Sequence, residues 1–324
     1  MRQSDKIYVA GHRGLAGSAI LRSLRSRGFD NLVTRTHAEL DLVDRQATQA
    51  FFQRERPDHV FVAAAKVGGI AANNAFPADF IFENLALQTN IIHEAWRAGV
   101  QRLQFLGSSC IYPRECPQPM KEDYLLSGPL EPTNRPYALA KIAGIEMCWS
   151  YNRQYGTRFL AVMPTNLFGP GDNYDLETSH VLPALIRKMH EAKLRREDKV
   201  TVWGSGAPRR EFMYSDDMAD ACTFLMTLAD ERFGQLVDPG RPPLLNVGTG
   251  SDVTVRELAE RVARAVGCSA RLEFDRSKPD GAPRKLLDVS RLAALSWRSR
   301  IPLEQGIAQA YESFGASSWS SAKQ

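Results

Sequence analysis

A tyrosine and a lysine four positions apart are the residues with the clearest chemical potential in this chain. Tyr137 and Lys141 lie in a segment with helical character that starts at Pro136, a residue favoured in a first helical turn. A separation of four places both side chains on one helical face, about one turn apart. An ammonium group nearby lowers the pKa of a phenol from about 10, which improves it as a proton donor or acceptor near neutrality. We therefore expect Tyr137 to exchange a proton with a substrate oxygen.

A serine strengthens this interpretation. Ser108 follows an apolar run, Leu103–Gly107, that has the character of a buried strand. A hydroxyl at the carboxyl end of such a strand can bind the same substrate oxygen as the tyrosine. The three residues together indicate interconversion of a carbonyl and an alcohol. The alternative is a core tyrosine and a solvated lysine with no chemical role.

A glycine-rich turn near the N-terminus suits the pyrophosphate of a dinucleotide. Gly11, Gly14 and Gly17 follow a strand-like run, Ile7–Ala10, and lead into a helix from Leu15. In such a turn one glycine permits a tight bend, another lets the backbone approach the pyrophosphate, and a third allows close helix–strand packing. The helix N-terminus then offers free N–H groups to the anion. The spacing is G-x-x-G-x-x-G, as in short-chain dehydrogenases.

The segment after the second expected strand favours NADP(H) over NAD(H). An NAD site usually places a carboxylate there for the ribose 2′-hydroxyl, but no carboxylate occurs before Glu39. Arg13 and Arg35 can instead bind a 2′-phosphate, and His37 can add a donor. Ordinary surface arginines are the alternative.

The elements that position these residues alternate regularly up to about residue 162. Short apolar runs are expected as strands, and longer segments with helical periodicity lie between them. This alternation predicts an α/β fold, a doubly wound parallel sheet of the Rossmann type, whose ligands bind at the carboxyl ends of the strands. The expected strands are Ile7–Ala10, Asn31–Arg35, His59–Ala63, Leu103–Gly107 and Arg158–Val162; the expected helices are Leu15–Arg27, Gln46–Glu55, Asp79–Ala98 and Pro136–Tyr155.

The second half of the chain is less regular. We expect residues 1–165 to form the dinucleotide-binding domain and 166–324 mainly a smaller C-terminal α/β substrate lobe, with about 211–250 returning to the first domain. A late strand is expected at Leu244–Val247. Thr254–Val266 predicts an amphipathic helix, with Thr254 and Glu257 forming a capping box. Ser317–Gln324 is expected to be a disordered end.

Composition excludes several classes of protein. The 324 residues carry 41 Lys and Arg against 37 Asp and Glu, an excess too small and too dispersed for a nucleic-acid surface. The densest basic spots, Arg209-Arg210 and Arg284-Lys285, suit one or two phosphates each. Five cysteines without paired spacing indicate neither a disulfide framework nor a metal site. With no apolar run of membrane-spanning length and no signal-like segment, the cytoplasm is the expected location.

The chain resembles the extended short-chain dehydrogenase/reductase family, and within it the branch of GDP-L-fucose synthases, the epimerase–reductases of GDP-4-keto-6-deoxy-mannose. The resemblance extends from about Lys6 to about Phe314. The segments that carry it are Gly11–Ile20, Ala63–Asn74, Gly107–Pro113 (GSSCIYP), Leu130–Ile145, Met163–Gly169, Val202–Gly206, Arg209–Phe212 and Asp275–Asp288, which contains SKPDG.

This resemblance implies a two-stage reaction. A ketone at C4 of the sugar acidifies the protons at C3 and C5, so each centre can be inverted through an enolate that Ser108 and Tyr137 stabilise. The family pattern assigns the acid and base to Cys110 and His180. NADPH then delivers hydride to C4 and Tyr137 supplies the proton. From the residues alone, Cys110 could equally be an inert apolar filler, and His180 could merely cap a helix starting near Val181.

The resemblance also implies ligand contacts. The substrate residues are Lys188, where relatives often have arginine, Trp203, Arg210 and Asp280. The remaining cofactor residues follow the strands and the loop after the second strand, where Asp41 and Leu42 either contact the adenine or only precede a helix. The full cofactor set is Gly11, Arg13, Gly14, Leu15, Gly17, Arg35, His37, Asp41, Leu42, Leu106, Gly107, Ser109, Lys141, Pro164, Asn166, Leu167 and His180.

The resemblance also implies a homodimer, formed through the helices Asp79–Ala98 and Pro136–Tyr155. Ser296 stands between Leu295 and Trp297 where relatives have glycine, and a structural effect is expected.

The competing functions are a nucleotide-sugar epimerase or dehydratase that retains NAD, and a non-catalytic dinucleotide-sensing or scaffold protein. A dehydratase would carry an acidic residue directly after Ser108, where this chain has Ser109.

Overall fold

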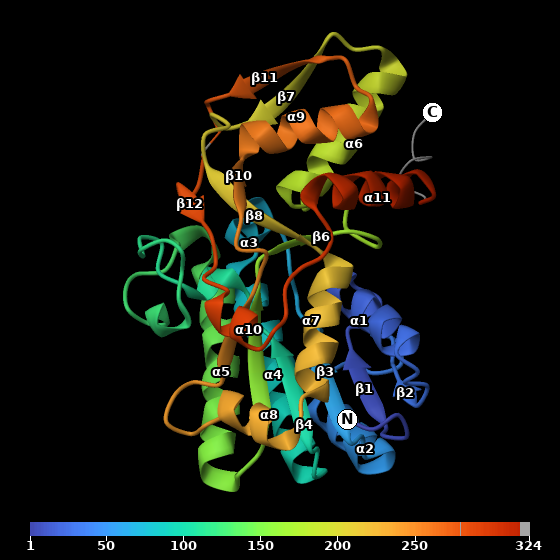
Figure 1. Cartoon of the computed structure of the whole chain (residues 1–324), viewed down its shortest axis with the longest axis vertical. Helices are drawn as coiled ribbons and strands as arrows, with labels where there is room; N and C mark the ends of the chain where they lie inside the picture. The colour runs from blue at the N-terminus through green and yellow to red at the C-terminus, as the bar shows by residue number, and fades with distance from the viewer. Residues whose placement is uncertain (279, 318–324) are drawn as a thin grey trace.

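The computed structural model of the chain describes residues 1–278 and 280–317. Figure 1 shows a larger lower part, which contains the N-terminus, and a smaller upper part built mainly from the second half of the chain. Of the tail expected to be disordered, 318–324 lie outside the described residues. No helix of the described residues is long and apolar enough to cross a membrane.

A six-stranded parallel sheet forms the centre of the larger part. Its strand order is β2-β1-β3-β4-β5-β9, and every neighbouring pair is parallel. The prediction of a doubly wound parallel sheet is confirmed. All residues of five of the strands are buried, which explains why these strands are mostly apolar. The strands are β1 (Ile7–Ala10), β2 (Leu32–Val33), β3 (His59–Val62), β4 (Arg102–Leu106), β5 (Phe159–Pro164) and β9 (Leu244–Val247).

The edge strand β2 is shorter than the predicted Asn31–Arg35. It has a single neighbour, β1, and only Ile7 and Tyr8 of that neighbour pair with it. Beyond Val33 the chain leaves the sheet, and the Arg35 guanidinium pairs with the carboxylate of Glu55. Periodicity cannot reveal how far a partner strand extends.

Two groups of helices cover the two faces of this sheet. Helices α1 and α7 pack together over one face, in the core cluster that contains Ile20 and Met218. Helices α2, α4 and α5 cover the other face, in the cluster that contains Phe52 and Ile145. The helices of this part are α1 (Leu15–Ser26), α2 (Arg45–Glu55), α3 (Ile70–Ala75), α4 (Pro77–Arg97), α5 (Arg135–Tyr155), α7 (Ser215–Thr227), α8 (Asp230–Leu236) and α10 (Ser290–Ala294).

The smaller part has its own apolar core between helices and short strands. Its central strand β8 pairs with β10, β12 and β6, and β7 pairs with β11. Helix α9 begins with the predicted capping box of Thr254 and Glu257, which is confirmed. The elements are β6 (Asn166–Phe168), α6 (Val181–Arg195), β7 (Lys199–Trp203), β8 (Arg209–Tyr214), β10 (Asp252–Thr254), α9 (Val255–Val266), β11 (Arg271–Asp275), β12 (Arg284–Lys285) and α11 (Leu303–Gly315).

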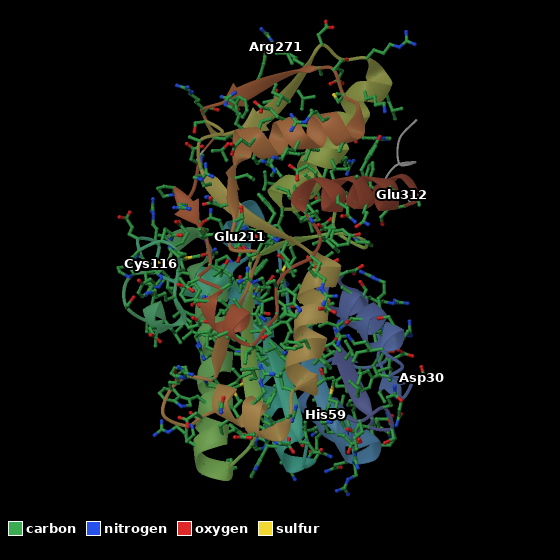
Figure 2. All side chains as sticks on the ribbon, in the orientation of Figure 1. Asp30, His59, Cys116, Glu211, Arg271 and Glu312 are labelled. Carbon is green, nitrogen blue, oxygen red and sulfur yellow. The ribbon has the colours of Figure 1, made fainter. Side chains whose placement is uncertain are left out.

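A buried carboxylate, Glu211 on β8, ties the two parts together (Figure 2). It accepts hydrogen bonds from the backbone N–H groups of Thr249, Gly250 and Leu287, at 2.6, 2.8 and 2.9 Å. Its own backbone oxygen accepts from the Asn166 amide, at 2.7 Å. Because an unsatisfied buried carboxylate is costly, these donors hold β8 and the loop after β9 in a fixed relation. The residues on either side of Glu211 are thereby positioned for the site described next.

Candidate active site

The glycine-rich turn lies between β1 and α1 and has the shape that a pyrophosphate requires. Gly11 has a φ of +80°, and a Cβ there would lie 2.6 Å from the backbone nitrogen of Ala64. A Cβ on Gly17 would lie 2.2 Å from the carbonyl oxygen of Gly11. Gly14 is the N-cap of α1 and has no side-chain cap, so the first N–H groups of the helix from Leu15 face outward. The turn therefore offers backbone donors where side chains are excluded.

The basic residues expected at the 2′-phosphate differ in the partners that they already have. Arg13 is exposed, and so is His37, which lies 3.8 Å from the Asp41 carboxylate. Arg35 is half-buried and pairs with Glu55 at 2.7 Å. Arg13 is therefore the freest of the three to bind an anion, and Arg35 would share its guanidinium with a carboxylate.

The loop after β2 has a structural role of its own. The Asp41 carboxylate accepts from the N–H of Val43 at 2.9 Å. Asp44 caps α2 by accepting from two backbone N–H groups. The side chain of Asn90 donates to the carbonyls of Leu42 and Val43. The interpretation of this loop as a helix-initiating segment is supported, and contact of Asp41 and Leu42 with an adenine stays a prediction.

The other residues expected along the cofactor lie at or just after the carboxyl ends of β4 and β5, and on β6. Leu106 ends β4 and Gly107 follows it, where a Cβ would collide with the side chain of Met163. Pro164 ends β5, while Ser109 begins a 3-10 helix, η1 (Ser109–Ile111). Asn166 and Leu167 lie on β6 and line the cavity described below. The topology thus collects these residues on one edge of the sheet.

Ser108, Tyr137 and Lys141 come together at this edge. Lys141 is 2% exposed, and its ammonium donates to the Leu106 carbonyl at 2.8 Å. It lies 5.8 Å from the centre of the Tyr137 ring, one turn along α5. Tyr137 is hydrogen-bonded to Ser108, which lowers the pKa of the phenol. The arrangement places a phenol and a hydroxyl side by side, with a buried cation behind them.

The expectation of a low pKa for the tyrosine is wrong for this structure. Burial dominates and raises the pKa of Tyr137 above its ordinary value, and the hydrogen bond to Ser108 only partly opposes this. Burial also lowers the pKa of Lys141 to about 8. The sequence predicts the spacing of the two groups, but the loss of water around them decides their titration.

A cavity of about 720 Å³ opens beside Ser108 and Tyr137, a volume typical of small-molecule sites. It runs from the sheet edge into the smaller part, between β4, α5 and α6 and the strands around β8. The expected residues that line it are Ser108, Ser109, Cys110, Tyr137, Asn166, Leu167, His180, Lys188, Trp203, Arg210 and Asp280.

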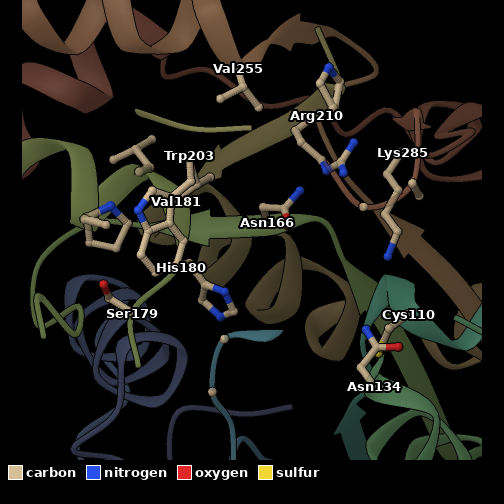
Figure 3. A pocket seen from close by; sticks show the side chains of 18 of the residues that line it. Cys110, Asn134, Asn166, Ser179, His180, Val181, Trp203, Arg210, Val255 and Lys285 are labelled. Carbon is tan, nitrogen blue, oxygen red and sulfur yellow. The ribbon is translucent and has the colours of Figure 1, made fainter. Parts of the chain in front are cut away.

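Cys110 and His180 face the cavity from different sides (Figure 3). Cys110 is buried on η1, and its thiol donates to the Ser108 hydroxyl at 3.1 Å. Burial raises the pKa of this thiol, while Lys285, Ser108 and Lys141 lower it. A pure filler role does not explain a polar contact at the cavity wall.

His180 occupies the N-cap position of α6 but does not cap the helix, because its side chain makes no capping hydrogen bond. The imidazole is accessible from the cavity yet surrounded by its walls. This partial desolvation lowers the pKa of His180, so that the neutral ring is favoured near neutrality. The alternative of a capping histidine is therefore not supported.

The far end of the cavity carries the residues expected to bind the substrate. Arg210 donates to the carbonyl of Asp280 at 3.4 Å, and the Asp280 carboxylate accepts from the N–H and the hydroxyl of Ser205, both at 2.7 Å. Trp203 is 55% exposed and is therefore not a core residue. The Lys188 ammonium lies 5.1 Å from the centre of its ring. Cations beside an exposed aromatic face suit a ligand with phosphates and a flat base.

Two residues of the cavity wall were not among the expected site residues. Asn134 precedes α5 and makes no capping bond, and it lines the cavity (Figure 3). Lys285 lies on β12, and its ammonium points toward the same cysteine (Figure 3). The sequence indicated Lys285 only as part of the basic pair Arg284-Lys285, and the tertiary structure is needed to distinguish the two residues. Arg284 pairs outside the cavity with Asp252.

Among the described residues no group of three His, Cys, Asp or Glu side chains could hold a metal ion.

Comparisons with known proteins agree with this geometry. The model of the NAD dependent epimerase/dehydratase family matches residues 7–237. GDP-L-fucose synthase of Escherichia coli is 55% identical over 310 residues, which cover 96% of each chain.

Two solved structures from Campylobacter jejuni are similar over nearly the whole chain. A GDP-6-OMe-4-keto-L-xylo-heptose reductase has 40% identity and a TM-score of 0.93, covering 98% of this chain and 99% of the other. A GDP-mannoheptose C4 reductase with NADP bound has 41% identity and a TM-score of 0.86, covering 97% and 99%. The chain belongs to the NAD dependent epimerase/dehydratase family and, within it, to the GDP-L-fucose synthases.

Proposed function

We propose that this chain epimerises GDP-4-keto-6-deoxy-D-mannose at C3 and C5 and reduces the C4 ketone with NADPH, giving GDP-L-fucose. The observation that carries the proposal is the single cavity that joins Ser108 and Tyr137 to Cys110, His180 and Arg210. Reduction alone needs only the first two. The additional cysteine and histidine are groups suited to moving protons on carbon.

The epimerisation follows from the positions of these groups. One of Cys110 and His180 removes the proton next to the ketone, and the electron pair of the C–H bond passes into an enolate. Ser108 and Tyr137 stabilise the oxygen anion by donating hydrogen bonds to it. The other group then returns a proton to the opposite face of the same carbon, which inverts it. Because the two groups lie on different sides of the cavity, one substrate orientation can serve both (Figure 3).

The reduction uses the glycine-rich turn and the sheet edge. The turn fits a dinucleotide, since close backbone packing leaves no room for a side chain at Gly11 or Gly17, and the N-terminus of α1 after Gly14 carries no side-chain cap and can offer its N–H groups to the pyrophosphate. Arg13 and Arg35 would hold the 2′-phosphate, and Asn166 and Leu167 would line the nicotinamide. NADPH supplies the hydride when bound. Tyr137 donates its proton to the C4 oxygen, and the positive charge of Lys141 stabilises the phenolate that remains.

The far end of the cavity binds the GDP part in this proposal. Arg210 and Lys188 would contact the phosphates, and Trp203 and Asp280 would complete the binding of the nucleotide. A lysine provides a point charge but not the two-pronged contact of an arginine, so the contact of Lys188 should be the looser one.

The direct test supplies the purified protein with GDP-4-keto-6-deoxy-mannose and NADPH or NADH and identifies the sugar product. We expect stoichiometric NADPH oxidation and GDP-L-fucose. Absence of both would refute the assignment. An enzyme that retains NAD, the main alternative, would copurify with its cofactor and consume no NADPH.

Two variants test the assignment of the proton-transfer groups. Cys110→Ser and His180→Gln should each slow deuterium uptake at C3 and C5 in heavy water by about 10²-fold or more, while NADPH still binds. Matched controls are Cys116→Ser, outside the cavity lining, and His190→Gln, whose ring contacts the Tyr311 hydroxyl. Unchanged deuterium uptake in Cys110→Ser would remove the cysteine from the mechanism.

We further propose a homodimer formed through α4 and α5. These helices pack on each other within the chain and still expose Phe82, Leu139 and Tyr155. Analytical ultracentrifugation should give twice the chain mass for the native protein and a smaller mass for Phe82→Asp.

A cytoplasmic location is proposed because all five cysteines are free thiols, as is usual in a reducing compartment.

A further inference from the structure

Lys285 is the feature of the cavity that no assigned role explains. It lies on β12 beside Arg210 of β8, and it lines the same cavity as Cys110. Figure 3 shows its ammonium directed across the cavity wall toward Cys110, away from the strand that carries it. Within the described residues this ammonium forms no hydrogen bond and no ion pair. A cation so placed needs a partner.

The charged and titratable groups around the two residues are few. Cys110 is faced by Lys285 from β12, by Lys141 and Tyr137 from α5, and by the hydroxyl of Ser108. Lys141 already donates to the Leu106 carbonyl. Of the charges that favour a thiolate at Cys110, that of Lys285 acts most strongly.

Lys285 in turn is faced by Cys110, Cys116, Arg210 and Glu131. The Glu131 carboxylate pairs with Arg114 at 3.4 Å and is therefore already engaged. Burial lowers the pKa of Lys285, and Cys110 exerts the strongest of the influences that raise it and so favour the charged ammonium. The two side chains are thus each other's principal electrostatic partner.

This pairing matters because Cys110 is buried. Burial disfavours a thiolate, yet the proposed proton transfer requires one. If the cysteine is the base, it begins as a thiolate and ends with an S–H bond, as the C–H bond breaks. If it is the acid, its S–H bond breaks as the new C–H bond forms, and a thiolate remains. In either role a fixed positive charge beside the sulfur lowers the cost of the charged form.

We propose that Lys285 is a positioning residue that supplies the counter-charge for the Cys110 thiolate and is needed for epimerisation more than for hydride transfer. The inference deepens the proposed function and rests on it for the reaction, but not for the charge pairing. The competing role is that of a simple phosphate ligand, like its neighbour Arg210. Such a ligand would affect substrate binding and leave the thiol unchanged.

The first experiment measures the thiol itself, without substrate. The rate of Cys110 alkylation by iodoacetamide is followed against pH by peptide mass spectrometry, in the native protein, Lys285→Met and Lys285→Arg. We expect Lys285→Met to move the midpoint upward by about one pH unit, a loss of about tenfold in rate at a pH below both midpoints, and Lys285→Arg to restore most of it.

The control for this measurement is Lys188→Met, which removes a lysine from the other end of the same cavity, beside Trp203. Its alkylation profile at Cys110 should match that of the native protein. An unchanged Cys110 profile in Lys285→Met would overturn the proposal, as would an equal shift in Lys188→Met. Equal NADPH binding by all variants verifies that each is folded.

The second experiment divides the reaction. In heavy water with the keto sugar and NADPH, Lys285→Met should lower the maximal rate of deuterium uptake at C3 and C5 by about tenfold, and Lys285→Arg should recover it. A rise in KM with an unchanged maximal rate would overturn the proposal in favour of a phosphate ligand. If the native protein shows no deuterium uptake and no NADPH oxidation, the proposed function fails, while the alkylation profiles still decide the pairing of Lys285 and Cys110.

Discussion

Replacing Lys141 with methionine should abolish activity without destabilising the protein at neutral pH. The lysine is 2% exposed, and burial lowers its pKa from 10.5 to about 8. A shift of that size corresponds to about 3 kcal/mol of unfavourable charge burial in the folded state. The variant removes this cost and loses one charge-assisted hydrogen bond, to Leu106, worth about 1.5–3 kcal/mol. We expect Lys141→Met to be between 0 and about 2 kcal/mol more stable than the native protein at pH 7.

The pH dependence of this difference is the sharper test. Because the pKa of Lys141 is lower in the folded than in the unfolded chain, the unfolded chain binds more protons between pH 8 and 10.5. The native protein therefore gains stability from this group as the pH rises through that window, and lacks that contribution below pH 8. Between pH 7 and pH 10 the advantage of Lys141→Met should fall by about 2 to 3 kcal/mol and change sign.

The assay is urea unfolding followed by fluorescence at pH 7, 9 and 10, with NADPH oxidation measured at pH 7. The control Lys193→Met removes an exposed lysine that also donates to one backbone carbonyl, that of Val266. Its effect on the free energy of unfolding should be the same at every pH. A Lys141→Met variant that is 2 kcal/mol less stable at pH 7, by a margin that does not change with pH, would refute the reasoning. Its NADPH oxidation should fall by about 10²-fold or more.

Three further substitutions test the cofactor site and the backbone. Arg13→Ala should raise KM for NADPH by about 10- to 100-fold and leave KM for NADH unchanged, and equal effects on both would exclude a 2′-phosphate contact. Ser296→Gly should raise the free energy of unfolding by about 1 kcal/mol, because Ser296 has a φ of +69° that glycine adopts at no steric cost; a loss of stability by calorimetry would contradict this. Thr254→Ala should cost about 1 kcal/mol by removing the capping box of α9, with NADPH oxidation unaffected, and unchanged stability would show that Glu257 alone caps the helix.

The elements of the sheet could be predicted because their residues are buried on both faces. Runs such as Val60–Val62 and Phe159–Pro164 are apolar along their whole length, as strands of a covered parallel sheet are. The edge strand β2 could not be delimited, since its length depends on how far β1 pairs with it. A structural effect was expected at Ser296, where relatives have glycine, and the structure shows a positive φ of +69° there.

The candidate site also has one part that the sequence predicts and another that only the tertiary structure reveals. Tyr137 and Lys141 are close in space because they share a helical face, which is a local property of the sequence. Ser108 lies at a strand end and reaches them because α5 packs against β4 and η1. Lys285 joins the cavity only through the packing of β12, and a separation of 175 positions from Cys110 is not a motif that spacing can reveal.

The sequence by itself determined the parallel sheet, the glycine turn for a pyrophosphate and the spacing of the tyrosine and lysine, because each depends on neighbours within a turn or a strand. Only the tertiary structure decided how those groups titrate and which charges face them. Burial raises the pKa of Tyr137 and lowers that of Lys141, against the expectation from their spacing. Desolvation depends on everything packed around a group, and Lys285 reaches Cys110 only after the two halves of the chain have folded against each other.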